Sequence, residues 1–178
     1  GGLKGGFGYA EAELSRGDDG LAGRVGAAVV VNAAGSGVNP ETGALWSDQR
    51  GALDIPDTVG RVALSAARGQ ADRPFNTTIG AVLTDLTVTK AQVGKVAAVA
   101  HDGLARAIRP AHGMTDGDTF FALASGRHLA PTDPMAGIGL LNRLLEVTAD
   151  VVVDACFAAL TAARTSGRLR AYRELAGL

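Results

Sequence analysis

The order of strand-like and helix-like segments is the feature that most limits how this chain can fold. Alternating or continuously apolar runs predict strands, and apolar residues spaced close to 3.6 positions apart predict helices. Two strands joined by an Asp-Gly turn at residues 16–20 predict a hairpin. The resulting order, β-β-α-β-α-β-α, favours a layered α/β sandwich with helices packed on sheets. The expected strands are 9–14, 24–32, 77–86 and 119–124, and the expected helices are 58–68, 90–108 (capped by Thr89) and 136–163.

Composition predicts one domain with a core of small side chains. The 178 residues are 47% hydrophobic but only 4% aromatic, and they include 25 glycines. The net charge of −1, without long runs of one sign, argues against a nucleic-acid or membrane-surface partner. A single cysteine, Cys156, excludes an internal disulfide framework and favours a reducing cytoplasm. Asp150 and Asp154 interrupt the longest apolar stretch, 147–163, which is therefore expected to be a core helix and not a membrane span.

The run Asn76-Thr77-Thr78-Ile79-Gly80 lies between a polar, proline-containing connector and an apolar strand. If the bond between Asn76 and Thr77 breaks, Thr77 becomes a new N-terminus that carries both a hydroxyl nucleophile and an α-amine. The pKa of such an amine is about 8, so it can take the hydroxyl proton and activate the nucleophile. The alternative is an ordinary strand that begins with two threonines, which strands favour.

A second polar cluster, residues 112–119, lies just before the last expected strand. Asp116 and Asp118 are separated by one glycine and could orient a nucleophile or hold the ammonium group of Thr77. The same carboxylates together with His112 form an incomplete metal-ligand set. A plain Asp-Gly turn with solvated acids is the third interpretation.

Three further polar positions have both a functional and a structural interpretation. Lys4 is flanked by glycines and can reach a pocket, although the phosphate-loop spacing is absent. Asn32 ends a buried strand, where its amide could donate to a developing oxyanion or simply terminate the strand. Asp102 and Arg106 are expected to pair across one helical turn, and His101 is expected to be a structural residue of the same helix.

Taken together, these motifs resemble those of the DmpA-type peptidases, which include L-aminopeptidase/D-esterases, β-aminopeptidases and nylon-oligomer hydrolases. The resemblance covers nearly the whole chain. It implies an αββα sandwich of the DmpA/ornithine acetyltransferase type, in a protein that cuts itself and becomes an N-terminal nucleophile hydrolase. The motifs, in order, are GGLKGG (1–6), VVVN (29–32), NTTIG (76–80), HDGLARAIRPAH (101–112) and DGDT (116–119).

The resemblance also implies a role for each candidate residue. Self-cleavage after Asn76 would divide the domain into 1–76, the end of an α-chain, and 77–178, a β-chain that begins with the nucleophile. Family precursors are about twice this length, so the family's N-terminal half is expected as a partner that this chain lacks. The implied site is Thr77 as nucleophile, Asp116 and Asp118 as the acidic pair, Asn32 as the oxyanion amide, and Lys4 as the pocket lysine.

The expected activity is hydrolysis of short amides with a free amino terminus. Candidate substrates are small peptides, β- or D-amino-acid amides and ω-amino-acid (nylon) oligomers, and the threonine with two aspartates is closest to the nylon-oligomer hydrolase branch. No cofactor or metal is implied, and a homo-oligomer is expected. The alternatives are a metal-dependent hydrolase using His112, Asp116 and Asp118, an acyltransferase like ornithine acetyltransferase, and a non-catalytic binding domain.

Overall fold

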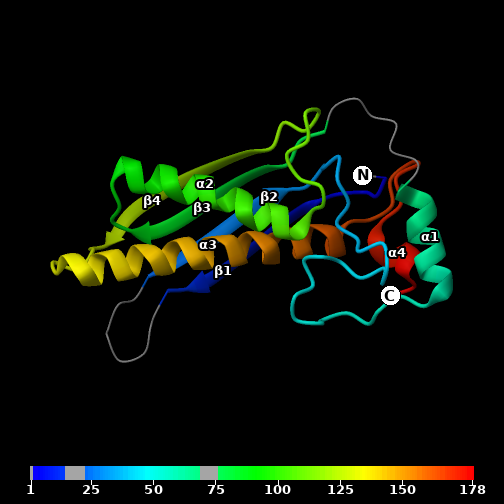
Figure 1. Ribbon diagram of the computed structural model, residues 1–178, viewed down its shortest axis with the longest axis horizontal. Helices are drawn as coiled ribbons and strands as arrows, with labels where there is room; N and C mark the ends of the chain where they lie inside the picture. Colours follow the sequence, from blue (N-terminus) through cyan, green and yellow to red (C-terminus); the bar gives the residue numbers. More distant parts are fainter. Residues whose placement is uncertain (1, 15–22, 69–75) are drawn as a thin grey trace.

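A computed structural model describes residues 2–14, 23–68 and 76–178. The predicted turn at 16–20 and the connector at 70–75 lie outside these ranges. The described chain forms the elements expected from the sequence, in the expected order, and ends with one further short helix (Figure 1). They are β1 (Phe7–Glu13), β2 (Arg24–Val30), α1 (Thr58–Arg68), β3 (Ile79–Leu86), α2 (Lys90–Ala107), β4 (Thr119–His128), α3 (Pro134–Ala162) and α4 (Tyr172–Ala176).

The four strands form one mixed sheet in the order β1-β2-β3-β4. The first two pair antiparallel, which confirms the predicted hairpin, and β2 also pairs antiparallel with β3. β3 and β4 are parallel because α2 carries the chain back between them. The register places Val30 beside Phe7 and Ile79, and Ile79 beside Thr119.

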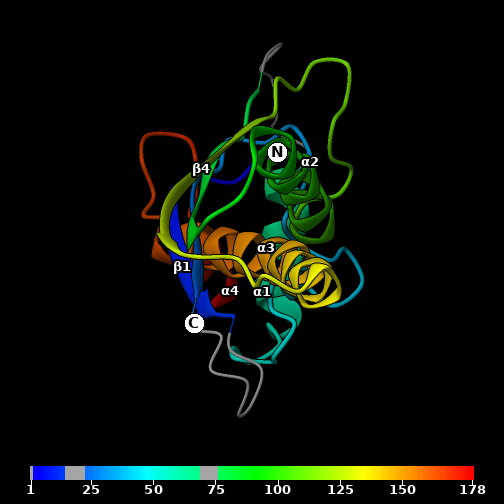
Figure 2. The same cartoon turned by 90° about the vertical axis from the view of Figure 1, so that its left-hand side faces the viewer.

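Helices α2 and α3 cover one face of this sheet (Figure 2). α3 packs on β1 and β2, while α2 packs on α3 and β4. α2 begins as predicted, because Thr89 and Gln92 form a reciprocal capping box that satisfies backbone N–H groups at its first turn. Asp133 caps α3 by accepting the Ala136 N–H, with Pro134 at the first helical position. Among the described residues, no helix combines the length and apolar character needed to cross a membrane.

Small residues bring α3 unusually close to β1. A Cβ atom built on Gly8 would lie 2.0 Å from the Ala155 carbonyl oxygen and 2.4 Å from the Ala159 nitrogen. Only glycine fits at such a distance from a helix backbone. Glycine and alanine at these positions therefore allow the backbones of β1 and α3 to approach closely.

The opposite face of the sheet is bare in the described chain and largely apolar, apart from the charged residues Glu11, Glu13 and Arg24 at one end. Residues alternate along each strand, so every second side chain points away from α2 and α3. In a single layer these side chains stay in solvent, whereas a sandwich would bury them. The exposed apolar residues on this face are Phe7, Tyr9, Val30, Ile79, Leu83, Phe121 and Leu123, and we call them the bare face.

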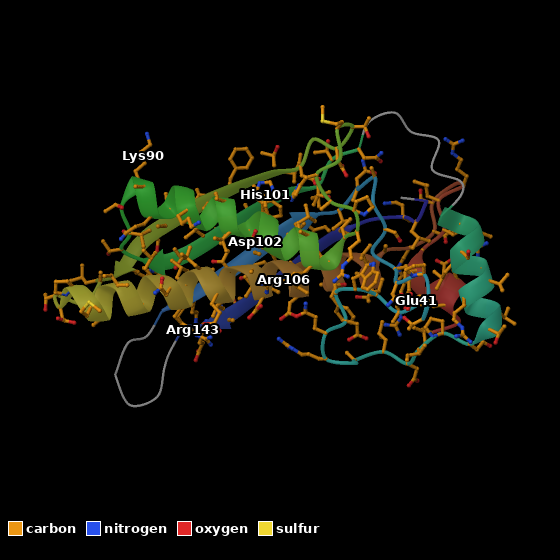
Figure 3. The ribbon with its side chains drawn as sticks, in the orientation of Figure 1. Glu41, Lys90, His101, Asp102, Arg106 and Arg143 are labelled. Carbon is orange, nitrogen blue, oxygen red and sulfur yellow. The ribbon has the colours of Figure 1, made fainter. Side chains whose placement is uncertain are left out.

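Several local expectations need correction. β4 continues to His128, beyond the expected end at residue 124. The basic segment 164–178, to which the expected elements do not extend, buries Tyr172, whose hydroxyl donates to the Gly43 carbonyl at 3.0 Å. Arg106 pairs with Asp150 of α3 at 3.0 Å instead of with Asp102, so this charge ties two helices together (Figure 3).

Candidate active site

The candidate site lies where the chain enters β3 and where the loop from α2 enters β4. Asn76 forms a parallel bridge with Asp116, and the Thr77 N–H donates to the Asn32 carbonyl at 3.1 Å. Two donors of the described chain form hydrogen bonds to the Asn76 carbonyl oxygen. The Thr77 Oγ1 donates to it at 2.6 Å and the Gly117 N–H at 2.9 Å. The hydroxyl of Thr77 and a backbone donor therefore meet at the carbonyl that precedes Thr77.

Asp118 is fully enclosed and makes three contacts with donors. Its side chain is only 2% exposed. One oxygen, Oδ1, accepts from the Thr78 N–H at 2.9 Å. The other, Oδ2, accepts from the His112 N–H at 3.3 Å and lies 3.0 Å from His112 Nδ1. These donors replace the water that a buried carboxylate loses, so Asp118 connects the loop at His112 to the backbone beside Thr77.

Asp116 has a different environment. Its Oδ2 accepts from the Ala34 N–H at 3.1 Å, but its buried Oδ1 has no hydrogen-bond partner in the described chain. Burial, followed by the nearby charge of Asp118, raises the pKa of Asp116 above its ordinary value. An unpartnered carboxylate oxygen of this kind can receive an ammonium group or a proton.

The structure brings Asn32 to this cluster, whereas no hydrogen bond joins Lys4 to it within the described residues. Asn32 neighbours Thr77 through its carbonyl, and its exposed side-chain amide makes no hydrogen bond within the described residues. Lys4 lies on the segment whose Gly6 carbonyl accepts from the Val31 N–H. The Nζ of Lys4 donates to the Gly5 carbonyl at 2.7 Å, not to a group of the Thr77 cluster.

Sequence reasoning missed two contributors to this site. The Gly117 N–H is a backbone donor, and its only trace in the sequence is the glycine between the two aspartates. The sequence suggests His112 as a metal ligand and His101 as a structural helix residue, yet their rings are in contact, with centroids 4.8 Å apart. Their placement in one motif, 101–112, was the available signal.

The metal-ligand interpretation finds little support in the geometry. Across residues 2–14, 23–68 and 76–178, no group of three or more His, Cys, Asp or Glu side chains is arranged to hold a metal ion. His112 and Asp118 pair with one another, whereas the partnered oxygen of Asp116 faces Ala34. The arrangement is instead suited to acyl chemistry, because it combines a hydroxyl, a carbonyl, a backbone donor and two carboxylates.

Comparisons with known proteins assign the family. The model of peptidase family S58 matches residues 1–171, so this chain belongs to that family. An uncharacterized aminopeptidase of Mycobacterium tuberculosis (strain H37Rv) is 40% identical over 189 residues, which cover 98% of this chain and 53% of that protein. A 6-aminohexanoate-oligomer endohydrolase of Paenarthrobacter ureafaciens is 34% identical over 67 residues, 38% of this chain and 19% of that protein.

Solved structures show the same fold. A Burkholderia sp. β-aminopeptidase superposes with a TM-score of 0.60 at 22% identity, covering 99% of this chain and 51% of its own. An L-aminopeptidase D-Ala-esterase/amidase from Ochrobactrum anthropi is described as a variant of the Ntn hydrolase fold. It superposes with a TM-score of 0.51 at 19% identity, covering 94% of this chain and 44% of its own. The predicted DmpA-type resemblance and layered fold are confirmed. The chain spans about half the length of the curated relatives that it matches most fully.

Proposed function

We propose that this chain carries the nucleophile of a self-processing amidohydrolase, with Thr77 exposed by cleavage after Asn76. The observation that carries the proposal is the pair of hydrogen bonds at the Asn76 carbonyl, 2.6 Å from the Thr77 hydroxyl and 2.9 Å from the Gly117 N–H. A nucleophile beside its target carbonyl, with a donor on the oxygen, is the arrangement that acyl transfer needs. The cut would separate residues 1–76 from residues 77–178.

The proposed self-cleavage is an N-to-O acyl shift followed by hydrolysis. Thr77 Oγ1 bonds to the Asn76 carbonyl carbon, while the C–N bond between the two residues breaks. The hydroxyl proton goes to the departing Thr77 nitrogen. The Gly117 N–H stabilises the oxyanion that forms on the Asn76 oxygen. Water then opens the ester, leaving an Asn76 carboxylate and a free Thr77 hydroxyl and amine.

In the cleaved protein the same groups would act on substrate. The Thr77 amine takes the proton of its own hydroxyl, which attacks the substrate carbonyl and releases the amine product; water then releases the acid. We assign Asp116, with its unpartnered Oδ1, to the Thr77 ammonium, and the free amide of Asn32 to the substrate oxyanion. Asp118 holds the backbone at Thr78, and Lys4 is proposed to reach the pocket. No cofactor is needed in this scheme.

We propose short amides with a free amino terminus as substrates. The relatives support this class, because their names describe aminopeptidases and a 6-aminohexanoate-oligomer endohydrolase. Small peptides, β- or D-amino-acid amides and ω-amino-acid oligomers all fit the chemistry. A homo-oligomer in the cytoplasm remains part of the same proposal.

We further propose that a second β-sheet covers the bare face. Its supporting observation is the exposure of large side chains on all four strands, from Phe7 of β1, which is 62% exposed, to Phe121 of β4, which is 58% exposed. Contiguous apolar surface of this kind marks an interface. The matched relatives are about twice as long as this chain, and the corresponding extra sequence is the proposed source of that sheet.

The intact mass of the purified full-length protein under denaturing conditions tests the nucleophile. Wild type should give two fragments that meet between Asn76 and Thr77, and Thr77→Ala should give one uncut mass. Thr78→Val is the matched control, because the buried Thr78 hydroxyl has no hydrogen-bond partner in the described chain and should be dispensable. An uncut wild type, or a cut Thr77→Ala, would disprove the proposal. Cleaved protein that transferred acyl groups to amines in preference to water would indicate the acyltransferase alternative.

A further inference from the structure

His112 lies in a backbone conformation that few residues adopt. Its φ is +59°, and it is the one non-glycine residue with positive φ in the part of the chain that the structure describes. A histidine in this left-handed region is uncommon and indicates a local constraint. Here the conformation directs both the backbone N–H and the ring Nδ1 of His112 at one oxygen of Asp118, at 3.3 and 3.0 Å.

Asp118 connects His112 to Thr78, the residue after Thr77. Its second oxygen accepts the Thr78 N–H at 2.9 Å, and its side chain is almost completely buried. The Thr78 carbonyl is held in turn by the Thr119 N–H at 2.9 Å. The peptide on the C-terminal side of Thr77 is therefore fixed by a carboxylate that His112 itself holds in place.

His101 of α2 restrains the His112 ring from the other side. The two rings meet edge to face at 62°, and His101 also contacts Phe120 of β4, with centroids 5.1 Å apart. Burial lowers the pKa of His101, and the neighbouring His112 lowers it further, against the opposing charges of Asp118 and Asp102. His101 is labelled on α2 in Figure 3. A neutral His101 ring packs against the His112 ring without repelling it.

We infer that His112 is a positioning residue. Through its contacts with Asp118, and through the hydrogen bond from Thr78 to Asp118, it keeps the Thr77 hydroxyl beside the Asn76 carbonyl. This inference rests on the proposed function, because it assigns Thr77 the role of nucleophile. His112 itself touches neither the Asn76 carbonyl nor Thr77 in the described contacts. Its contribution is to orientation, and small displacements of a nucleophile reduce rates steeply.

Three variants distinguish the effect of the His112 ring from the effect of the His112 backbone conformation. His112→Gly keeps the left-handed backbone, which glycine adopts readily, and removes the ring donor. His112→Asn also tolerates this backbone and retains a side-chain N–H that can reach Asp118. His128→Asn is the matched control, because His128 pairs with Asp85 at 3.4 Å at the far end of β4.

Two measurements are made on each full-length variant: the rate of self-cleavage by intact mass, and hydrogen exchange at the Thr78 amide. For His112→Gly we expect cleavage to slow by about 10- to 100-fold and exchange to quicken by about tenfold or more. His112→Asn should stay within a few-fold of wild type in both, and His128→Asn should be unchanged. In variants that do cleave, kcat should fall more than KM rises.

The two readouts distinguish failure of this inference from failure of the proposed function. If wild type is never cleaved but His112→Gly loses Thr78 protection, His112 does order the backbone at Thr78 through Asp118, and it is the nucleophile proposal that falls. If Thr78 protection is unchanged in His112→Gly, or if His112→Asn behaves like His112→Gly, the inference is overturned. A drop in melting temperature with normal cleavage in every variant would reveal a purely structural histidine and also overturn it.

Discussion

Substituting alanine for Gly8 tests the close packing of β1 on α3. The new Cβ would lie 2.0 Å from the Ala155 oxygen, whereas ordinary contact begins near 3.4 Å. Strand and helix must therefore separate by more than 1 Å locally. Overpacking usually destabilises by about 1–3 kcal/mol, and about 3 kcal/mol applies here because the obstacle is helix backbone. Alanine also lowers the conformational entropy of the unfolded chain, which stabilises the folded protein by about 0.5–1 kcal/mol. The net decrease in the free energy of unfolding is therefore about 2 kcal/mol.

Gly94 provides the matched control for this substitution. It lies exposed within α2, and a Cβ there would meet nothing within 4 Å. Gly94→Ala should therefore stabilise the protein by about 0.8–1 kcal/mol through helix propensity alone. Urea unfolding followed by far-ultraviolet circular dichroism should shift the midpoint down by about 1 M for Gly8→Ala, if the slope is near 2 kcal/mol/M, and up for Gly94→Ala. A Gly8→Ala protein as stable as wild type, with an unchanged slope, would refute the packing argument.

Three further predictions concern a helix cap, a buried thiol and a buried carboxylate. Thr89→Ala should lower the free energy of unfolding by about 1 kcal/mol, measured by urea unfolding, because it removes the acceptor for the Gln92 N–H. Burial raises the pKa of Cys156 to about 12, so a thiol reagent should label it only after denaturation, as read by mass. Because the pKa of Asp116 is raised in the folded state, its stabilising contribution is present at low pH and is lost as pH rises through that pKa. Asp116→Asn should therefore reduce the loss of stability between acidic and neutral pH, measured as urea midpoints across that range.

Local signals in the sequence were sufficient for most elements of the fold. The α1 boundaries, the hairpin strands and the Thr89 cap followed from periodicity and capping chemistry. The burial of Tyr172 could not be predicted in this way, because its partner Gly43 lies 129 positions earlier. The last residues of β4 were missed since they are largely exposed and lack a buried alternation.

The sequence predicted which residue types form the candidate site, but it predicted fewer of the contacts between them. The acidic pair was expected near Thr77, and the structure does bring Asp116 and Asp118 beside Asn76 and Thr78. The different surroundings of the two aspartates depend on backbone N–H groups, which a sequence does not display. The same reason explains why the Gly117 donor was missed, while the position of Lys4 at the cluster remains a prediction.

The register of the sheet connects the candidate site to the bare face. Val30 pairs with Ile79, and the same antiparallel register continued by two residues sets Asn32 opposite Thr77, as their hydrogen bond shows. Side chains two residues apart on a strand share a face, so Asn32 lies on the side of Val30 and Thr77 on the side of Ile79. Both of those neighbours belong to the bare face and are about half exposed. A layer that covers the bare face as far as Val30 and Ile79 would therefore lie beside the proposed nucleophile and its oxyanion amide. We expect substitutions in that covering layer to change substrate preference, while Asn32, Thr77 and the acidic pair keep their chemistry.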